Sequence, residues 1–363
     1  MTTIDVEKIA EAVLYEGYLL FPYRHSSLKN QQRWTFGGIY PRAYSEATGG
    51  DDPWLMQTQC LLEGDPETKI EVKIRYLHVV ERKVQADVQE APHFVEELRI
   101  GREVYKPWEE AIEREQILRD SSRGGRIRLG DLLAEPRHFT IDVPAGSSEE
   151  TLYDADEVEV GALVREWSSI QGKVDLTAQT LEMPESSSSS QMSSKPLVRL
   201  TVRIVNTTPL SPGQPMPSRV EAVRHALIST HTILHVVDGD FVSLLDPPEG
   251  FQRAAAECEN IKTWPVLVGE TGERQIMLSS PIILYDYPQV SPESQGNYFD
   301  ATEIDELLAL SVLTLTDDEK REMWESGEHG REILKRTEAL SEEQLMKMHG
   351  VVRYLKPVRG ESE

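Results

Sequence analysis

Two histidines and an aspartate lie close together in the sequence and are the residues best suited to chemistry. His231 and His235 are four residues apart, and Asp238 follows three residues later. On a helix, residues four apart share one face, so the two imidazoles would converge. Two imidazoles and a carboxylate are ligands that zinc, nickel and iron accept. Two interpretations stay open: a metal site, or ordinary helix histidines followed by an acidic turn.

Other sequence signatures of catalysis are missing. The sequence has no GxxxxGK[ST], GxGxxG, GxSxG or HExxH motif, which disfavours ATP use, nicotinamide chemistry and the common hydrolase mechanisms. Cys60 and Cys258 form no CxxC pair, which excludes a disulfide scaffold or a four-thiolate zinc site. Acidic neighbours argue against Cys258 as a nucleophile, because they raise the pKa of a thiol. We predict no cofactor and no catalytic residue, and a non-enzyme is favoured over an enzyme.

Aromatic residues in two irregular segments suggest recognition of a partner. The first segment, 15–44, is long and lacks regular periodicity, and long loops of this kind usually pack or carry function. The second begins where an apolar stretch ends in two tyrosines around an aspartate. Trp, Tyr and Arg dominate binding hot spots, and the expected contact residues are Arg24, Arg33, Trp34, Phe36, Tyr285, Tyr287 and Phe299.

Strands are expected to hold most of these residues in place. Alternating apolar residues predict a hairpin whose two strands meet at a turn over 64–67. His78 falls on the apolar face of the second strand, where a histidine is expected to bond to backbone. The predicted strands are 54–62, 69–80, 126–129, 138–143, 163–167, 173–182, 197–205, 241–245, 264–268 and 282–285.

Helices are expected in three later places. Pro107 suits the first turn of a helix over 108–118, and a helical pattern begins at Ser218 and leads toward the histidines. Thr316 and Ser341 each open a capping box, so the last 64 residues are expected to be helical. Strands first and helices last predict an α+β fold, with an antiparallel β-rich N-terminal and central part and a helical C-terminal region.

Composition and helical patterns suggest three segments. Residues 1–215 would form a β-rich domain with an N-terminal helix, and residues 216–300 a mixed α/β segment packed on it. Residues 301–363 would be the helical C-terminal segment. Residues 184–195 are rich in serine, which predicts a flexible loop between paired strands.

The charge of the chain narrows its partners. The 363 residues carry a net charge of −24, which disfavours nucleic acid and anionic membrane surfaces, since both require basic patches. No apolar run approaches the roughly 20 residues of a membrane-spanning helix. The acidic N-terminus lacks the features of a signal peptide, and two cysteines fit a reducing compartment. These features predict a cytoplasmic protein without a membrane span.

Separated blocks along nearly the whole chain resemble an uncharacterised bacterial family. Among them are Phe21-Pro-Tyr-Arg24, Phe241-Val-Ser-Leu-Leu-Asp-Pro-Pro248 and Thr263-Trp-Pro-Val-Leu-Val-Gly-Glu270, and others lie at 15–18, 27–30, 279–288 and 299–306. Genes of that family lie beside nickel–iron hydrogenase genes, and no activity is established for it. The resemblance implies a biological setting, and it transfers no catalytic residue.

Together, the residues and the resemblance favour an accessory protein in assembly or maturation of a nickel–iron hydrogenase. It would act by binding a hydrogenase subunit or a maturation factor through the aromatic residues. One alternative is a metal-dependent enzyme of unknown reaction that uses His231 and His235. A second alternative is a structural subunit of the hydrogenase complex.

Overall fold

The computed structural model describes residues 37–86, 92–101, 103–120, 125–182, 195–210, 215–288, 315–325, 331, 334–335 and 337–339. The chain divides into two compact units, one of residues 1–18 and 33–289, the other of residues 19–32 and 290–363. Arg24, Arg33, Trp34, Phe36 and Phe299 lie outside the described residues, as does most of the Ser-rich segment.

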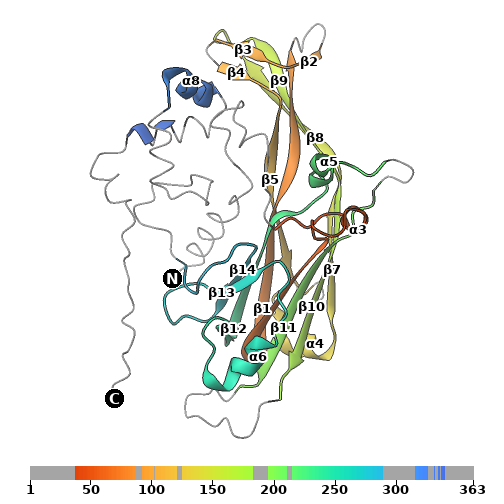
Figure 1. The fold of residues 1–363 in the computed structure, drawn as a ribbon, viewed down its shortest axis with the longest axis vertical. Helices are drawn as coiled ribbons and strands as arrows, with labels where there is room; N and C mark the ends of the chain where they lie inside the picture. The colour runs from red at the N-terminus through yellow and green to blue at the C-terminus, as the bar shows by residue number, and fades with distance from the viewer. Residues whose placement is uncertain are drawn as a thin grey trace. The chain divides into compact units, whose positions relative to one another are not determined.

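The first unit is built on one very long strand, β1 (Leu55–Ala86) (Figure 1). It pairs with strands on both sides in a 12-stranded sheet whose main path runs β13-β14-β12-β1-β11-β10-β7. These partners are β7 (Arg137–Val143), β10 (Ile170–Thr180), β11 (Leu197–Asn206), β12 (Ile228–Val242), β13 (Trp264–Leu267) and β14 (Ile276–Ser280).

Further strands extend the sheet along β1 from Lys69 to Ala86. They are β2 (His93–Val95), β5 (Trp108–Leu118), β6 (Ile127–Arg128) and β9 (Glu159–Trp167), which pair with β1, and β8 (Gly146–Tyr153), which pairs with β9. A separate two-stranded sheet joins β3 (Leu98–Ile100) to β4 (Glu103–Tyr105). Short helices lie between strands: α3 (Arg42–Ala47), α4 (Leu129–Ala134), α5 (Arg219–Val223), η1 (Glu249–Phe251) and α6 (Gln252–Ala256).

The predicted hairpin turn at 64–67 is a bulge inside β1. The register against β12 changes from Gly64 opposite Gly239 to Lys69 opposite Val237, so residues 65–68 face Asp238 alone. The Thr68 hydroxyl closes the bulge, because it accepts from the Asp65 N–H (3.0 Å) and donates to the Asp238 carbonyl (2.6 Å). Turn-forming residues therefore bend the strand without reversing it.

The α+β prediction is wrong, because the described chain is predominantly antiparallel β. Strands make up 54% and helices 15% of it. The helix expected over 108–118 is β5, which pairs residue by residue with β1. Cross-strand ion pairs hold it there: Lys73 with Glu115 (3.2 Å), Arg75 with Glu113 (3.0 Å) and Arg82 with Glu110 (2.6 Å). The acidic side chains of this segment are therefore cross-strand partners of β1.

The helix expected from Ser218 toward the histidines is also wrong beyond its first turns. Ser218 does open α5 through a capping box with Glu221, but α5 ends at Val223. Residues 228–242 form β12, which pairs with β1 and β14. Ile, Thr and Val fill much of this stretch, and their branched side chains favour strands. Residues 282–285, expected as a strand, have no regular structure, and the neighbouring strand is β14.

One apolar cluster joins the strands of the sheet. The alternation predicted for 70–76 and 198–204 is confirmed, since Ile70, Val72, Ile74 and Tyr76 are buried together with Val198, Leu200, Val202 and Ile204. Residues of β10, β12 and β14 join them, and Leu129 and Leu132 of α4 pack against the same cluster. No helix in the described ranges is both long enough and apolar enough to span a bilayer.

The helical C-terminal region is not found as predicted. In the second unit the described residues contain α8 (Asp317–Glu325) and a few further helical positions. Thr316 precedes α8 as its capping box implied, and its carbonyl accepts from the Lys320 N–H (2.8 Å). Lys320 also pairs with Glu338 (3.2 Å), and the Lys335 ammonium lies over the Trp324 ring. Among the described residues, this capping box thus marks the start of one short helix.

Candidate functional site

The structure does not bring the proposed metal ligands together. His231 and His235 lie on β12, where four residues span about 13 Å, whereas metal–nitrogen bonds are about 2 Å long. Asp238 occupies the bulge with a left-handed backbone (φ 61°). Within the described ranges, no group of three or more His, Cys, Asp or Glu side chains is placed to hold a metal ion. The helical spacing that motivated a shared site is absent.

His231 has a structural environment. Its side chain is fully buried, its Nδ1 lies 2.7 Å from the Ser229 carbonyl oxygen, and its Nε2 lies 3.2 Å from the Ser280 hydroxyl. Burial, and then the nearby charge of Arg75, lower the pKa of His231 to about 4. The neutral imidazole can donate from Nδ1 and accept at Nε2, so both nitrogens are used within the fold.

The two cysteines also have the character of buried groups. Burial is the main cause that raises the pKa of both the Cys60 and the Cys258 thiol. The acidic neighbour that we expected to act on Cys258, Glu257, adds to this effect but is secondary. A raised pKa disfavours the thiolate that a nucleophile requires.

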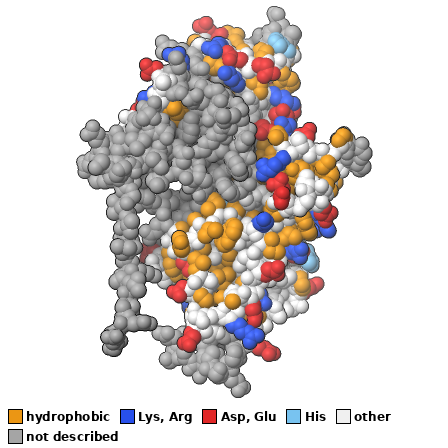
Figure 2. All heavy atoms as spheres, viewed as in Figure 1, with side chains coloured by type: hydrophobic (Ala, Val, Ile, Leu, Met, Phe, Trp, Pro, Cys, Tyr) orange, Lys and Arg blue, Asp and Glu red, His pale blue; other side chains and the backbone are white. Residues whose placement is uncertain are grey.

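An exposed apolar surface lies at the β13 end of the sheet. Tyr285 is 82% exposed, Ile283 is 68% exposed and Trp264 is 42% exposed. Trp264 belongs to β13, and the other two alternate along the segment 281–288 that follows β14. Figure 2 shows hydrophobic side chains gathered over this part of the molecule. We call Trp264, Ile283 and Tyr285 the β13 surface.

The β13 surface sits on an apolar layer of its own. Val266, Leu278 and Ile233 lie opposite one another on neighbouring strands and form a buried cluster with Val268. Ile282 and Leu284 pack against that cluster, between the exposed residues of the segment. The other face of these strands carries Leu234, Leu267 and Met277, which belong to the main core. Both faces of the sheet are therefore apolar here.

Asp286 fixes the segment that carries Ile283 and Tyr285. One carboxylate oxygen accepts from the Leu267 N–H (2.8 Å), and the other accepts from the Ser243 hydroxyl. The next residue, Tyr287, donates its N–H to the Leu267 carbonyl (2.7 Å). Bonds to a charged acceptor are stronger than neutral ones, so the exposed side chains are presented by an ordered backbone.

The two tyrosines around Asp286 have different roles. Tyr287 has a left-handed backbone (φ 57°), and its side chain is partly buried against the main core. Tyr285 points away from that core and is the more exposed of the two. Of the contact residues predicted from the sequence, the structure therefore assigns Tyr285 to the surface and Tyr287 to the core.

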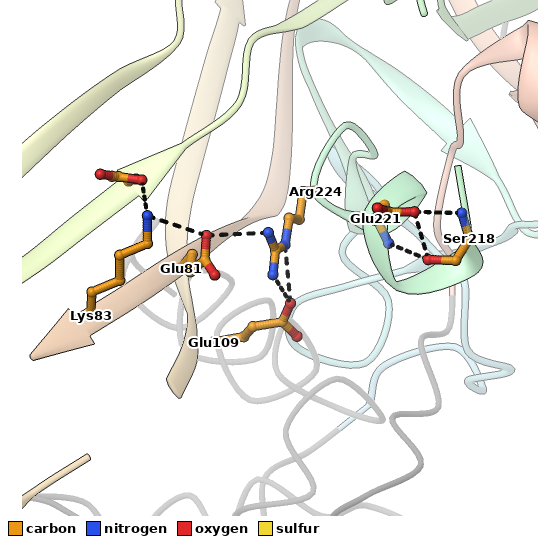
Figure 3. A network of polar contacts seen from close by, with 7 residues as sticks. Glu81, Lys83, Glu109, Ser218, Glu221 and Arg224 are labelled. Carbon is orange, nitrogen blue, oxygen red and sulfur yellow. Dashed lines mark hydrogen bonds and ion pairs between the residues drawn. The ribbon is translucent and has the colours of Figure 1, made fainter. Parts of the chain in front are cut away.

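A second polar region surrounds Arg224, just after α5. Its guanidinium contacts Glu81 of β1 (3.2 Å) and Glu109 of β5 (3.1 Å), and Lys83 continues the network to Glu81 (3.9 Å) (Figure 3). Arg224 also lines a cavity of about 480 Å³ whose other walls include Met216 and His225. Because two carboxylates already bind the guanidinium, this network ties α5 to the sheet.

Removing the Asp286 carboxylate is expected to loosen the β13 surface. We expect Asp286→Ala to destabilise the protein by about 1 to 2 kcal/mol, the scale of hydrogen bonds to a charged group at a partly exposed site. The Leu267 amide should then exchange with solvent faster, because it loses its acceptor. Asp286→Asn keeps one acceptor oxygen and should retain most of the protection. Hydrogen exchange resolved at Leu267 measures the effect.

The matched control removes a neighbouring carboxylate that makes no such bond. The control is Asp246→Ala. Asp246 lines the same cavity of about 220 Å³ as Asp286, and its side chain is exposed. Its substitution should leave Leu267 protected. Equal exchange in the wild type and Asp286→Ala would show that the carboxylate does not order the segment.

Comparisons with known proteins give no family. No family model matches the chain, and no curated protein matches it. Among solved structures, the Salmonella SPI-1 type III secretion injectisome secretin InvG aligns over 77% of each chain with 9% identity and a TM-score of 0.09.

Proposed function

We propose that the chain is an accessory protein in assembly or maturation of a nickel–iron hydrogenase, and that it acts by binding a protein through the β13 surface. The observation that carries the binding role is the exposure of Trp264 on β13 and of Ile283 and Tyr285 on the anchored segment beside it. Tryptophan and tyrosine anchors at the centre of an interface contribute most of its binding energy. The hydrogenase setting rests on the family that the sequence blocks resemble.

Several features support protein binding over other roles. Clustered apolar side chains on a surface favour association with another protein, while a net charge of −24 disfavours nucleic acid. The free cysteines Cys60 and Cys258 fit a cytoplasmic location. Arg24, Arg33, Trp34, Phe36 and Phe299 stay predicted members of the contact surface.

Of the two alternative functions, the structure disfavours the enzyme, whereas the structural subunit is compatible with the same contact surface. A metal-dependent enzyme would require His231 and His235 at one site, and β12 holds them apart. A structural subunit would use the same contact surface as a maturation factor. The two roles differ in when the chain leaves the hydrogenase.

Co-purification during hydrogenase assembly tests the proposal. A tagged hydrogenase subunit is purified from cells that express the full-length chain, once from immature enzyme and once from the mature complex. We expect the chain in the immature fraction alone. Retention in the mature complex would indicate a structural subunit, and absence from both fractions would contradict a hydrogenase role.

A further inference from the structure

The two edge strands of the sheet, β13 and β7, differ in whether their outward-facing backbone N–H and C=O groups are hydrogen-bonded. At one end, the Val268 N–H bonds to Ile276 of β14, so alternation directs Pro265 and Leu267 of β13 outward. Pro265 has no N–H to offer. The outward N–H of Leu267 bonds to Asp286, and its carbonyl accepts from Tyr287. This edge is closed to a further strand, which is how native sheets avoid pairing with one another.

Among the described strands, the opposite edge, β7, is open. Gln171 of β10 bonds to Thr207 and Thr208 on the β11 side, so the even-numbered residues of β10 face β7. Gly172 pairs with Ile141 and Val174 with Phe139, which directs the odd-numbered residues of β7 inward. The backbone groups of His138, Thr140 and Asp142 therefore point outward. In the described part of the chain, β10 is the strand that pairs with β7.

The sequence of this open edge is symmetric about its middle. Pro136 and Pro144 stand four residues on either side of Thr140, and His138 and Asp142 stand two residues on either side. His138, Thr140 and Asp142 are exposed on one face. Phe139 and Ile141 lie on the other face, against the main core. If two copies of this strand paired antiparallel about Thr140, Thr140 would lie opposite Thr140, and His138 would lie opposite Asp142.

We propose that β7 binds β7 of a second copy of this chain, in antiparallel register about a two-fold axis at Thr140. Thr140 faces its own counterpart, and His138, whose Nδ1 lies 2.6 Å from Asp175 Oδ1 of β10 in the same copy, faces Asp142 of the other copy. Each of the three outward residues then exchanges both backbone hydrogen bonds with its opposite residue. Thr–Thr cross-strand pairs are favourable, and a self-complementary patch is what a two-fold dimer requires.

The prolines set the limits of this pairing. Shifting the register by two residues in either direction would place a proline opposite His138 or Asp142, and proline cannot donate to the ladder. The centred register is the one that uses all three outward residues. No bulge interrupts β7 against β10, and no lysine lies on it; both devices would otherwise protect an edge.

Charge substitutions at the axis test the proposal. The full-length wild type should sediment at high concentration with twice the 41.1 kDa of one chain. Thr140→Lys places two ammonium groups opposite each other, and Thr140→Glu places two carboxylates there, so each variant alone should be monomeric. An equimolar mixture of the two should regain the dimer, because lysine then faces glutamate. Thr140→Ser keeps the hydroxyl and should stay dimeric.

Three outcomes would overturn the proposal. The wild type could be monomeric throughout the concentration series, or both charged variants could dimerise like the wild type. A mixture that stays monomeric would also contradict an axis at Thr140. Thr140 is exposed, so the variants should fold, and matching thermal melts of the four proteins verify this. None of these outcomes bears on hydrogenase binding, which uses the other edge of the sheet.

Discussion

Acidification from about pH 7 to about pH 4 is expected to reduce the free energy of unfolding by several kcal/mol through two buried histidines. His78 and His231 are fully buried, and burial is the main cause that lowers the pKa of each to about 4. The unfolded chain binds these protons near pH 6.5. Each histidine therefore contributes stability above pH 6.5 that is lost as the pH falls toward 4. The scale is about 3 kcal/mol for each histidine.

His78 differs from His231 in its hydrogen bonding. Its side chain lies beside the backbone of Ser168 and Arg224, but neither ring nitrogen makes a well-aligned hydrogen bond in the described structure. His78 therefore lies next to backbone groups, as predicted, but its ring nitrogens are not aligned for hydrogen bonds to them. The charge of Arg114 adds to burial in lowering its pKa, so protonation introduces a second cation into the same buried region.

Substitutions separate these histidines from the many carboxylates that titrate in the same range. His231→Asn keeps a donor for the Ser229 carbonyl and should flatten the fall in stability between pH 6.5 and 4 by about 3 kcal/mol. His78→Gln should do the same. His93→Gln replaces a histidine with an exposed side chain and controls for the substitution itself. Urea unfolding at a series of pH values measures this, and identical pH profiles for all four proteins would exclude the buried histidines as the cause.

Asn206→Ala is the single substitution expected to destabilise the protein most among those considered. The buried Asn206 amide donates to the carbonyls of Ile39 and His225, both at 2.8 Å, and its oxygen accepts from the Thr208 N–H at 2.9 Å. Alanine would leave the His225 carbonyl and the Thr208 N–H buried without these partners. At 1 to 3 kcal/mol for each orphaned group, with a small cavity added, we expect a loss of about 3 to 5 kcal/mol.

Two further variants make that prediction specific. Asn206→Asp preserves shape but turns a carboxylate oxygen toward two carbonyls, so it should be at least as destabilising as alanine. Asn260→Ala also removes two hydrogen bonds, to the backbone of Gln59, but at a partly exposed site where water can replace them. It should cost about 1 kcal/mol. If chemical denaturation gave equal losses of unfolding free energy for Asn206→Ala and Asn260→Ala, the hydrogen bonds of Asn206 to Ile39, His225 and Thr208 would not have the predicted effect.

The parts of the fold that could be predicted from sequence are the strands with one buried face. Period-two alternation identified 70–76 and 198–204 because a half-buried strand repeats every second residue. The helix predicted over 108–118 rested on Pro107 as a first-turn residue. The segment instead pairs with Lys73, Arg75 and Arg82 of β1, which lie far away in the sequence. Tertiary pairing overrode the local pattern.

At the candidate site too, contacts between distant residues decided which side chains are exposed. The exposed Tyr285 was identified from its aromatic context, whereas Tyr287 has a similar context and packs inward, because Asp286 and the left-handed backbone turn the chain between them. Ile283 lay in an apolar run that indicated a buried strand, so its exposure could not be read from sequence. Trp264 next to Pro265 was the available signal for an edge strand, and it pointed to this surface.

Capture of the chain by a tagged hydrogenase subunit, compared between Tyr285→Ala and Tyr153→Ala, tests the central claim most directly. Tyr153 is 58% exposed on β8, away from the β13 surface (Figure 1), so its loss controls for removing an exposed tyrosine. We expect Tyr285→Ala to weaken capture at least about tenfold, the effect of losing roughly 1.4 kcal/mol at a hot spot, with unchanged thermal stability. Tyr153→Ala should bind like the wild type. Undiminished capture of Tyr285→Ala, or equal losses in both variants, would contradict binding through the β13 surface.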